Sequence, residues 1–463
     1  MRRCARLLVL LIVVLTVVRS AQPVRADEPA NEELIQMVIG FLGDSDKDVR
    51  ALALDQIRNK APGETATTTF AGQMSKLSAE AQVGLLGALA DRGDSAAKPT
   101  VVEVLNSAKE PELRSAAIRA LGKLGSGDDC KTLITLLTGG SDADRAAARA
   151  SLVQLRGGDV SSAIVGMIDG SAPDDQVALI ELLTARRALE TIPTLLELSV
   201  GDDPAVRAAA MTALGKLAEP EHIGPMTRGV LAAKRGRERD AAEKNVMFVC
   251  QRIDEEDRRA DELLAAMQSA SPGDRLALLP LLGRVGGPAA LAEVGKAIAS
   301  SDRSVHAQGI RAISNWPDAS VAEQLIELAR SDEHKDHRRT ARMALIRVAP
   351  LPDGRTDAEK LALLQSAMKL ADNVAERNYA LRRAAAIRLV ETLRFVRPYL
   401  KQPPHAEQAC LSIVELAHDR KLRDDNKPEF HAALDDVLAT TKDAVVIDRA
   451  KRYKRGQTWV RPK

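Results

Sequence analysis

The chain has 463 residues, of which 2% are aromatic and 28% are charged, and its formal net charge is +2. So few aromatic residues, together with the absence of alternating β-branched runs, exclude a β-rich domain and favour helices packed through small side chains. The near-balance of charge argues against nucleic acid as a partner, because nucleic-acid-binding proteins are basic overall or in one region.

The first 26 residues have the pattern of a secretory signal peptide. Arg2, Arg3 and Arg6 precede an apolar stretch at residues 7–18, and residues 24–26 offer a signal peptidase its small residues. The apolar stretch is too short to span a bilayer comfortably, although an uncleaved anchor is the alternative. We therefore expect an exported protein, periplasmic or extracellular, that meets a membrane only transiently through this segment. Cleavage would remove five of the 66 basic residues, leaving 61 basic and 64 acidic ones.

Residues 27–371 are predicted to form an array of helical hairpins. A first helix at residues 32–42 is followed by two degenerate repeats at 44–77 and 78–106. More regular units start near residues 108, 141, 171, 202, 270, 301 and 332. Residues 234–269 exceed one period and are highly charged. Residues 348–357 are predicted to be an inserted loop, because two prolines and a glycine cannot continue a helix.

The clearest unit is the segment at residues 202–231. Asp203 can cap a helix that begins at Pro204, a residue suited to the first helical position. One apolar stripe then recurs at three- and four-residue steps, and its members are Val206, Ala210, Leu214 and Leu217. A break at residues 218–220 leads to a second amphipathic helix at 223–231. The same string occurs 93 residues earlier, at 111–124, which is three periods of 31.

A helix-pair unit of this length with the pattern D-x-x-V-R-x-A-A-x-x-A-L-G resembles the HEAT repeat, more narrowly the short repeats of phycobilin lyase-type proteins. The resemblance covers residues 32–438 and implies an all-α fold, an α-solenoid in which stacked two-helix repeats wind into a superhelix. It implies little about function, because such repeats host unrelated activities. Chaperoning of a cofactor, as in the lyase-type proteins, has no matching motif here. HEAT-like deoxyhypusine hydroxylases bind iron through His-Glu pairs, but none of the seven histidines here precedes a glutamate.

Two further sets of residues recur along the array. The first is an arginine at equivalent unit positions, which either faces a ligand or pairs with acids such as Asp142 or Asp202; its members are Arg50, Arg114, Arg145, Arg207 and Arg338. His306 takes the same position in a later unit. The second set is Cys130, Cys250 and Cys410. Because they lie several repeats apart in a solenoid, we expect buried free thiols that form neither a disulfide nor a metal site.

The character of the chain changes at residue 372. Residues 372–441 are predicted to be divergent repeats or a cap, with six arginines on one long helical stretch, and residues 442–463 a basic tail. Arginine and aromatic residues are typical of binding hot spots. The candidate partner-binding residues are therefore Arg383, Arg394, Tyr399, Tyr453, Arg455 and Trp459. The alternatives are a cap that needs bulky side chains and a disordered tail.

Catalytic motifs are missing: the sequence has no glycine-rich phosphate loop, G-x-S-x-G, H-E-x-x-H or C-x-x-C. His334 and His337, among nearby acids, are weak candidates for metal ligands, but such residues on an exposed charged turn are more often polar surface, and we expect no cofactor. The leading hypothesis is an exported, non-catalytic scaffold whose concave face binds another protein or peptide segment. The alternatives are a lyase-like or metal-assisted enzyme, and a binder of anionic cell-surface polymer through the arginine-rich C-terminal region.

Overall fold

The structure is a computed structural model that describes residues 30–157 and 159–460. Within these ranges the chain forms helices and connecting loops, without a strand. No described helix combines the length and the apolar character needed to cross a membrane. The chain divides into two compact units, which meet between Thr191 and Ile192. The predicted signal peptide at residues 1–26 lies outside the described residues.

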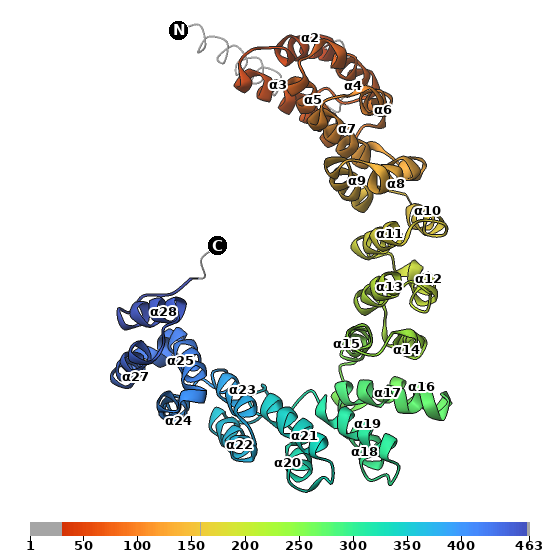
Figure 1. Cartoon of the computed structure of the whole chain (residues 1–463). Helices are drawn as coiled ribbons and strands as arrows, with labels where there is room; N and C mark the ends of the chain where they lie inside the picture. Colours follow the sequence, from red (N-terminus) through yellow and green to blue (C-terminus); the bar gives the residue numbers. More distant parts are fainter. Residues whose placement is uncertain (1–29, 158, 461–463) are drawn as a thin grey trace. The chain divides into compact units, whose positions relative to one another are not determined.

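The first unit contains the first helices of five repeats and the second helices of four of them, because α12 (Ile192–Leu198), which follows α11, belongs to the second unit (Figure 1). An initial helix, α2 (Ala30–Leu42), precedes them. The other helices are α3 (Lys47–Asn59), α4 (Glu64–Ala71), η1 (Met74–Lys76), α5 (Ala79–Arg92), η2 (Ser95–Ala97), α6 (Lys98–Ser107), α7 (Pro111–Leu124), η3 (Gly127–Asp129), α8 (Cys130–Gly139), α9 (Asp142–Gln154), α10 (Val160–Ile168), α11 (Pro173–Arg186) and η4 (Leu189–Thr191).

The second unit continues the same alternation. Its helices are α12 (Ile192–Leu198), α13 (Pro204–Leu217), η5 (Pro220–His222), α14 (Ile223–Ala232), α15 (Arg237–Cys250), η6 (Glu256–Arg258), α16 (Asp261–Ser269), α17 (Pro272–Val285), α18 (Pro288–Ile298), α19 (Arg303–Ser314), α20 (Ala322–Ser331), α21 (Lys335–Val348), α22 (Asp357–Leu370), α23 (Val374–Ala384), α24 (Val390–Val396), η7 (Arg397–Lys401), α25 (Pro403–His418), α26 (Arg420–Asp425), α27 (Lys427–Thr440) and α28 (Ala444–Lys454).

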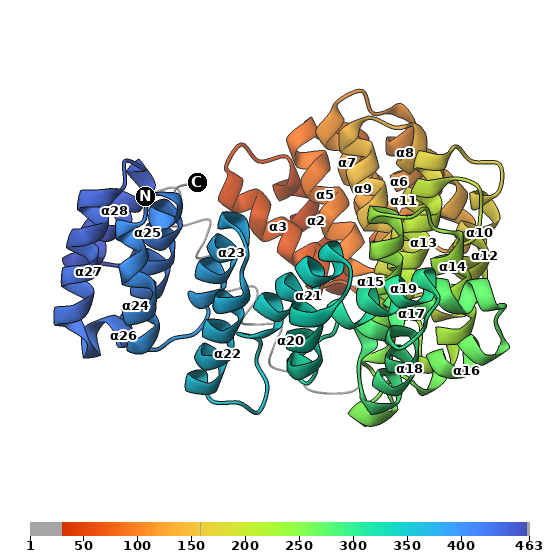
Figure 2. The ribbon, with the colours of Figure 1, turned by 60° about the horizontal axis from the view of Figure 1, so that its bottom comes forward.

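Within each unit, hairpins pack against their sequential neighbours. The first helices form one row: α3, α5, α7, α9 and α11 in the first unit, and α13, α15, α17, α19, α21, α23 and α25 in the second. Second helices such as α12, α14 and α16 pack in a separate row. Figure 2 shows α20 beside α21 and α22 beside α23. This confirms the predicted all-α solenoid of stacked two-helix repeats.

The unit at residues 202–231 forms as its sequence predicts. The Asp203 side chain accepts hydrogen bonds from the backbone N–H groups of Ala205 and Val206, and so caps α13, which begins at Pro204. All four residues of the predicted apolar stripe are buried. The helix ends at Leu217 and α14 begins at Ile223. Because an isolated hairpin cannot cover both its faces, burial of this stripe depends on the neighbouring hairpins.

Glycine is required where successive first helices cross. A Cβ atom added to Gly122 on α7 would lie 2.5 Å from the Cβ of Ser151 on α9. At the corresponding site in the second unit, a Cβ on Gly283 of α17 would clash with the backbone of Ala312 on α19. The glycine of the A-L-G pattern is therefore the point at which the next repeat makes its closest approach.

The repeating arginines link neighbouring hairpins, which confirms the pairing interpretation at three of the five positions. Arg207 donates to the backbone carbonyls of Gly201 and Asp202 in its own repeat, and its Nη2 lies 2.7 Å from Oε1 of Glu238 in the next. Arg50 with Glu80 and Arg114 with Asp144 repeat the pattern. The acids differ from those named in the sequence analysis: Asp142 pairs with Arg145 inside α9, and Asp202 contributes its carbonyl.

Two expectations for the C-terminal part are wrong. The arginine-rich stretch is not one long helix, because residues 385–389 separate α23 from α24. Burial of Ile387 and a 2.7 Å hydrogen bond from Arg388 to the Glu415 carbonyl hold this break, so tertiary contacts override local helix preference. Residues 442–463 are not simply a tail, since they contain α28. Cys130, Cys250 and Cys410 are buried free thiols, as expected.

Candidate functional site

Five arginines from four successive first helices of the second unit form what we call the arginine row: Arg284 on α17, Arg311 on α19, Arg347 on α21, and Arg382 and Arg383 on α23. The row exists because each hairpin presents its first helix beside that of the preceding repeat. In Figure 1, the first helices of this unit follow its inner side.

Acidic residues neutralise one end of the arginine row. Asp240 and Glu243 project from α15, and Glu243 is 1% exposed. Arg284 lies 3.1 Å from Asp240 and 2.7 Å from Glu243, while Arg311 lies 3.2 Å from the same oxygen of Asp240. Two carboxylates therefore hold two guanidinium groups across three repeats.

The middle of the row is positive and half-buried. Arg347 donates hydrogen bonds to the backbone carbonyls of Ser314 (3.1 Å) and Trp316 (2.6 Å) in the preceding repeat. Burial lowers the pKa of Arg347, and the positive charges of Arg383 and Arg284 lower it further. Its charge is thus held close to two others of the same sign.

The far end of the row has no acidic partner. Arg383 donates to the backbone carbonyl of Arg347 at 2.9 Å, and its buried Nε has no hydrogen-bond partner. The exposed Arg382 lies over the ring of Tyr379, 5.0 Å from its centre. Among the described residues, no carboxylate forms an ion pair with Arg347, Arg382 or Arg383. This end can therefore accept negative charge from outside the chain.

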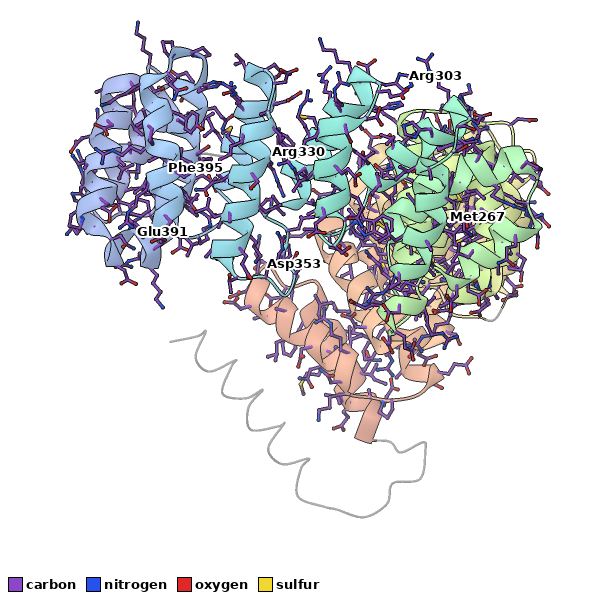
Figure 3. The ribbon with its side chains drawn as sticks, turned by 90° about the horizontal axis from the view of Figure 1, so that it is seen from below. Met267, Arg303, Arg330, Asp353, Glu391 and Phe395 are labelled. Atoms are coloured by element: carbon purple, nitrogen blue, oxygen red, sulfur yellow. The ribbon has the colours of Figure 1, made fainter. Side chains whose placement is uncertain are left out.

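The other predicted partner-binding residues lie elsewhere. Arg394 on α24 is already bound by Glu429, with distances of 2.8 and 2.6 Å to its two oxygens. Tyr399 on η7 packs edge-on between Phe395, which is labelled in Figure 3, and His405. These contacts link α24 and η7 to α25 and α27.

The last candidates cluster around α28. Tyr453 is 1% exposed, and its hydroxyl lies 2.9 Å from Nδ1 of His418. The guanidinium of Arg449 contacts the rings of both Tyr453 and Trp459. Arg455 is exposed just beyond α28. Of the six predicted residues, Arg383 alone belongs to the arginine row, so the structure does not bring the set together.

A second polar cluster, the histidine cluster, joins α19 to the start of α21. His334 and His337 were candidates from sequence; the structure adds His306 and the buried Asp332. Nε2 of His306 lies 2.9 Å from Oδ2 of Asp332, and Nδ1 of His337 lies 3.3 Å from Oδ1. The ring centres of His334 and His337 are 4.9 Å apart.

The electrostatics of this cluster favour its charged forms. Burial lowers the pKa of His306, but the Ile298 carbonyl and the Asp332 carboxylate outweigh it, so the pKa is raised. Burial raises the pKa of Asp332, but hydrogen bonds from the His334 backbone N–H and from His306 bring it below its ordinary value.

The histidine cluster borders an open groove of about 760 Å³. The groove runs between α18, α19 and α20, and its lining includes His306, Asp332, His334, Glu327 and Arg303. Arg303, the first residue of α19, is labelled in Figure 3. The groove gives the cluster access to small solutes.

Sequence reasoning missed both the arginine row and the role of His306. The available signal was that His306 replaces the repeating arginine, while Asp332 stands near the position of that arginine's acidic partner, 26 residues later. Predicting that these two residues are in contact required knowing how neighbouring repeats stack.

Comparison with known proteins supports the fold. Residues 71–153 and 260–346 match the family model of HEAT repeats. No curated protein matches the sequence. The karyopherin Kap121p bound to Pho4p is 14% identical with a TM-score of 0.46, covering 92% of this chain and 54% of the karyopherin. Kap95p, from a complex with RanGDP, is 12% identical with a TM-score of 0.44, covering 92% of this chain and 66% of its own. Human deoxyhypusine hydroxylase is 19% identical with a TM-score of 0.24, covering 62% of this chain and 96% of the hydroxylase.

These similarities concern the fold, and this chain spans about half the length of the first karyopherins that it matches. The histidine cluster and its groove lie within the second matched segment. The sequentially stacked two-helix units and the two segments that match the family model show that this chain contains HEAT repeats.

Proposed function

We propose that this protein is an exported, non-catalytic scaffold, and that the arginine row binds an acidic, extended segment of another protein. The observation that carries the proposal is the set of arginines at the α21–α23 end that have no acidic partner among the described residues. Arginine is enriched in binding hot spots, and complementary charge directs the choice of partner.

The geometry of the row suits an extended ligand. Its five arginines come from four consecutive repeats, so they follow the direction in which the hairpins stack. Neighbouring helices lie about 8–10 Å apart, so an extended chain rising about 3.3 Å per residue would pass one repeat every three residues or so. Tyr379, stacked with Arg382, adds an aromatic surface at the unneutralised end.

Export is part of the proposal because of the sequence of residues 1–26. N-terminal sequencing of the protein recovered from the periplasmic or secreted fraction should begin near Asp27. Protein that remains in the cytoplasm and starts at Met1 would contradict export, without bearing on the arginine row.

Binding is tested with the full chain and a fluorescein-labelled glutamate-rich peptide, followed by anisotropy. Replacing Arg382 with Glu should weaken binding about tenfold or more, because a favourable charge contact is replaced by a repulsive one. Arg119→Glu is the matched control, since Arg119 is an exposed residue on a first helix of the other unit. Equal binding by both variants would contradict the placement of the site.

The same titration, repeated with heparin, distinguishes a peptide ligand from an anionic polymer. Heparin is a flexible anionic polymer, and a surface that selects only charge should bind it at least as well as the peptide. If Arg119→Glu weakens heparin binding as much as the arginine-row variant does, the result would favour general polymer binding over a peptide site.

A further inference from the structure

The histidine cluster has the features of a metal site, and these do not depend on the arginine row. Three of its four members, His306, Asp332 and His337, have ligand-type atoms that all lie within 4.8 Å of one another. They come from consecutive repeats, on α19, the α20–α21 connection and α21. Stacking of the repeats therefore fixes their spacing.

The hydrogen-bonding of His306 determines which of its nitrogens is free. Nδ1 lies 2.6 Å from the backbone carbonyl of Ile298, which can only accept, so Nδ1 carries a proton. The lone pair of neutral His306 is then on Nε2, which faces Oδ2 of Asp332 at 2.9 Å. Two lone pairs at that distance require a proton or a cation between them. A backbone carbonyl that orients a histidine in this way is a common outer-shell partner at metal sites.

His337 also has a ring nitrogen next to the Asp332 carboxylate. Its Nδ1 is buried and has no hydrogen-bond partner, although it lies 3.3 Å from Oδ1 of Asp332. The carboxylate itself is fixed, because Oδ1 accepts the backbone N–H of His334 at 2.8 Å and the Asp332 side chain is 1% exposed. This buried nitrogen, which has no hydrogen-bond partner and lies next to a fixed carboxylate, is placed to bind a metal ion.

Two of the separations are near those expected around a transition metal. Two ligands at about 2.0–2.2 Å from zinc in tetrahedral geometry stand roughly 3.4 Å apart. The two nitrogen–oxygen distances, 2.9 and 3.3 Å, are close to this value. Two imidazoles and one carboxylate form a donor set that zinc accepts and magnesium does not favour.

We propose that His306, Asp332 and His337 bind a divalent transition-metal ion, zinc by its donor set. His306 contributes Nε2, His337 contributes Nδ1, and Asp332 contributes its carboxylate, whose Oδ2 faces His306 and whose Oδ1 faces His337. Since His306 and Asp332 also line the groove, the remaining coordination position faces that groove and is open to water or a small anion.

The test uses the full chain, stripped of metal with a chelator and then dialysed against Zn²⁺. Wild-type protein should retain a single zinc ion that His306→Gln and His337→Gln each bind at least tenfold more weakly, because each removes one ligand. His431→Gln, on α27, is the matched control and should bind as wild type. Equal zinc retention by all four proteins would overturn the proposal, as would wild-type protein that retains none.

A second measurement needs no variant. In the unaltered chain labelled with ¹⁵N at histidine, NMR during zinc titration should show His306 keeping its proton on Nδ1 and His337 keeping its proton on Nε2. Zinc that shifts only other histidines, or that leaves both rings unchanged, would show that the cluster is an ordinary His–Asp ion pair.

Discussion

The two units use the same helical position in opposite ways. Position 13 of the first helix is Asp91 on α5 and Lys123 on α7, but Arg284 on α17 and Arg347 on α21. In the first unit, Asp91 lies 2.6 Å from Lys123 and 2.9 Å from Arg58, so one carboxylate pairs with both cations across three successive repeats. In the second unit, Arg347 has no carboxylate partner among the described residues. The stacking geometry thus does not depend on charge balance at this position, which leaves charge available for a ligand.

Burial is the second difference between these regions, and it predicts the largest effect. Glu376 is 1% exposed and accepts from Arg342 at 2.8 and 3.1 Å. Glu376→Gln should lower the free energy of unfolding by about 3 kcal/mol, because the buried guanidinium then keeps only the exposed Asp372, 3.7 Å away, as a counter-charge. Urea denaturation measures this change in the transition of the second unit.

The control for that result is the double variant Arg342→Met with Glu376→Leu. Replacing a buried ion pair by apolar side chains is often neutral, so most of the lost stability should return. A double variant as unstable as Glu376→Gln would show that packing, and not the unpaired charge, is responsible.

Close helix crossings predict the next largest effect. Gly122→Ala should destabilise the first unit by about 1–3 kcal/mol, because the new methyl group meets Ser151 of the next repeat. Gly87→Ala on α5 has open space around it and should be neutral or stabilising by up to about 1 kcal/mol. Thermal unfolding of both variants measures the difference, and an equal effect at the two sites would mean that the crossing is not tight.

Acid should weaken the buried ion pair between Arg342 and Glu376. Burial raises the pKa of Glu376, but the Arg342 guanidinium, the Asp372 N–H and Asn373 outweigh it, so the folded-state pKa is lowered. A depressed pKa contributes stability above the unfolded value of about 4.3, and this contribution is lost as pH falls through the folded value. The urea midpoint of wild type should therefore fall more steeply than that of Glu376→Gln below about pH 4.3. Parallel curves would contradict this.

The smallest expected effect is at the exposed charges of the first unit. Asp91→Asn should cost no more than about 1 kcal/mol, because surface ion pairs contribute little. It should also leave Arg58 and Lys123 unpaired, so the glutamate-rich peptide should bind this variant more tightly than wild type at low salt. Unchanged peptide binding would mean that unpaired charge on a first helix is not sufficient to create a site.

Much of the fold was predictable because its determinants are local. The cap at Asp203, the start at Pro204 and the apolar stripe of α13 all lie within one period, and each is confirmed. The break at residues 385–389 was missed because Arg388 is held by the Glu415 carbonyl of α25, 27 residues later in the chain. The arginine row and the His306–Asp332 contact were missed because their residues become neighbours only when repeats stack.

The most direct test of the arginine row is photo-crosslinking from Tyr379. A benzoylphenylalanine placed there in the full chain, and at Arg119 as the first-unit control, is irradiated in the compartment where the protein resides. We predict crosslinks from position 379 to an acidic segment of another protein, lost on adding Arg382→Glu, and none from position 119. Crosslinks to the same partner from both positions, or from 119 alone, would contradict the account.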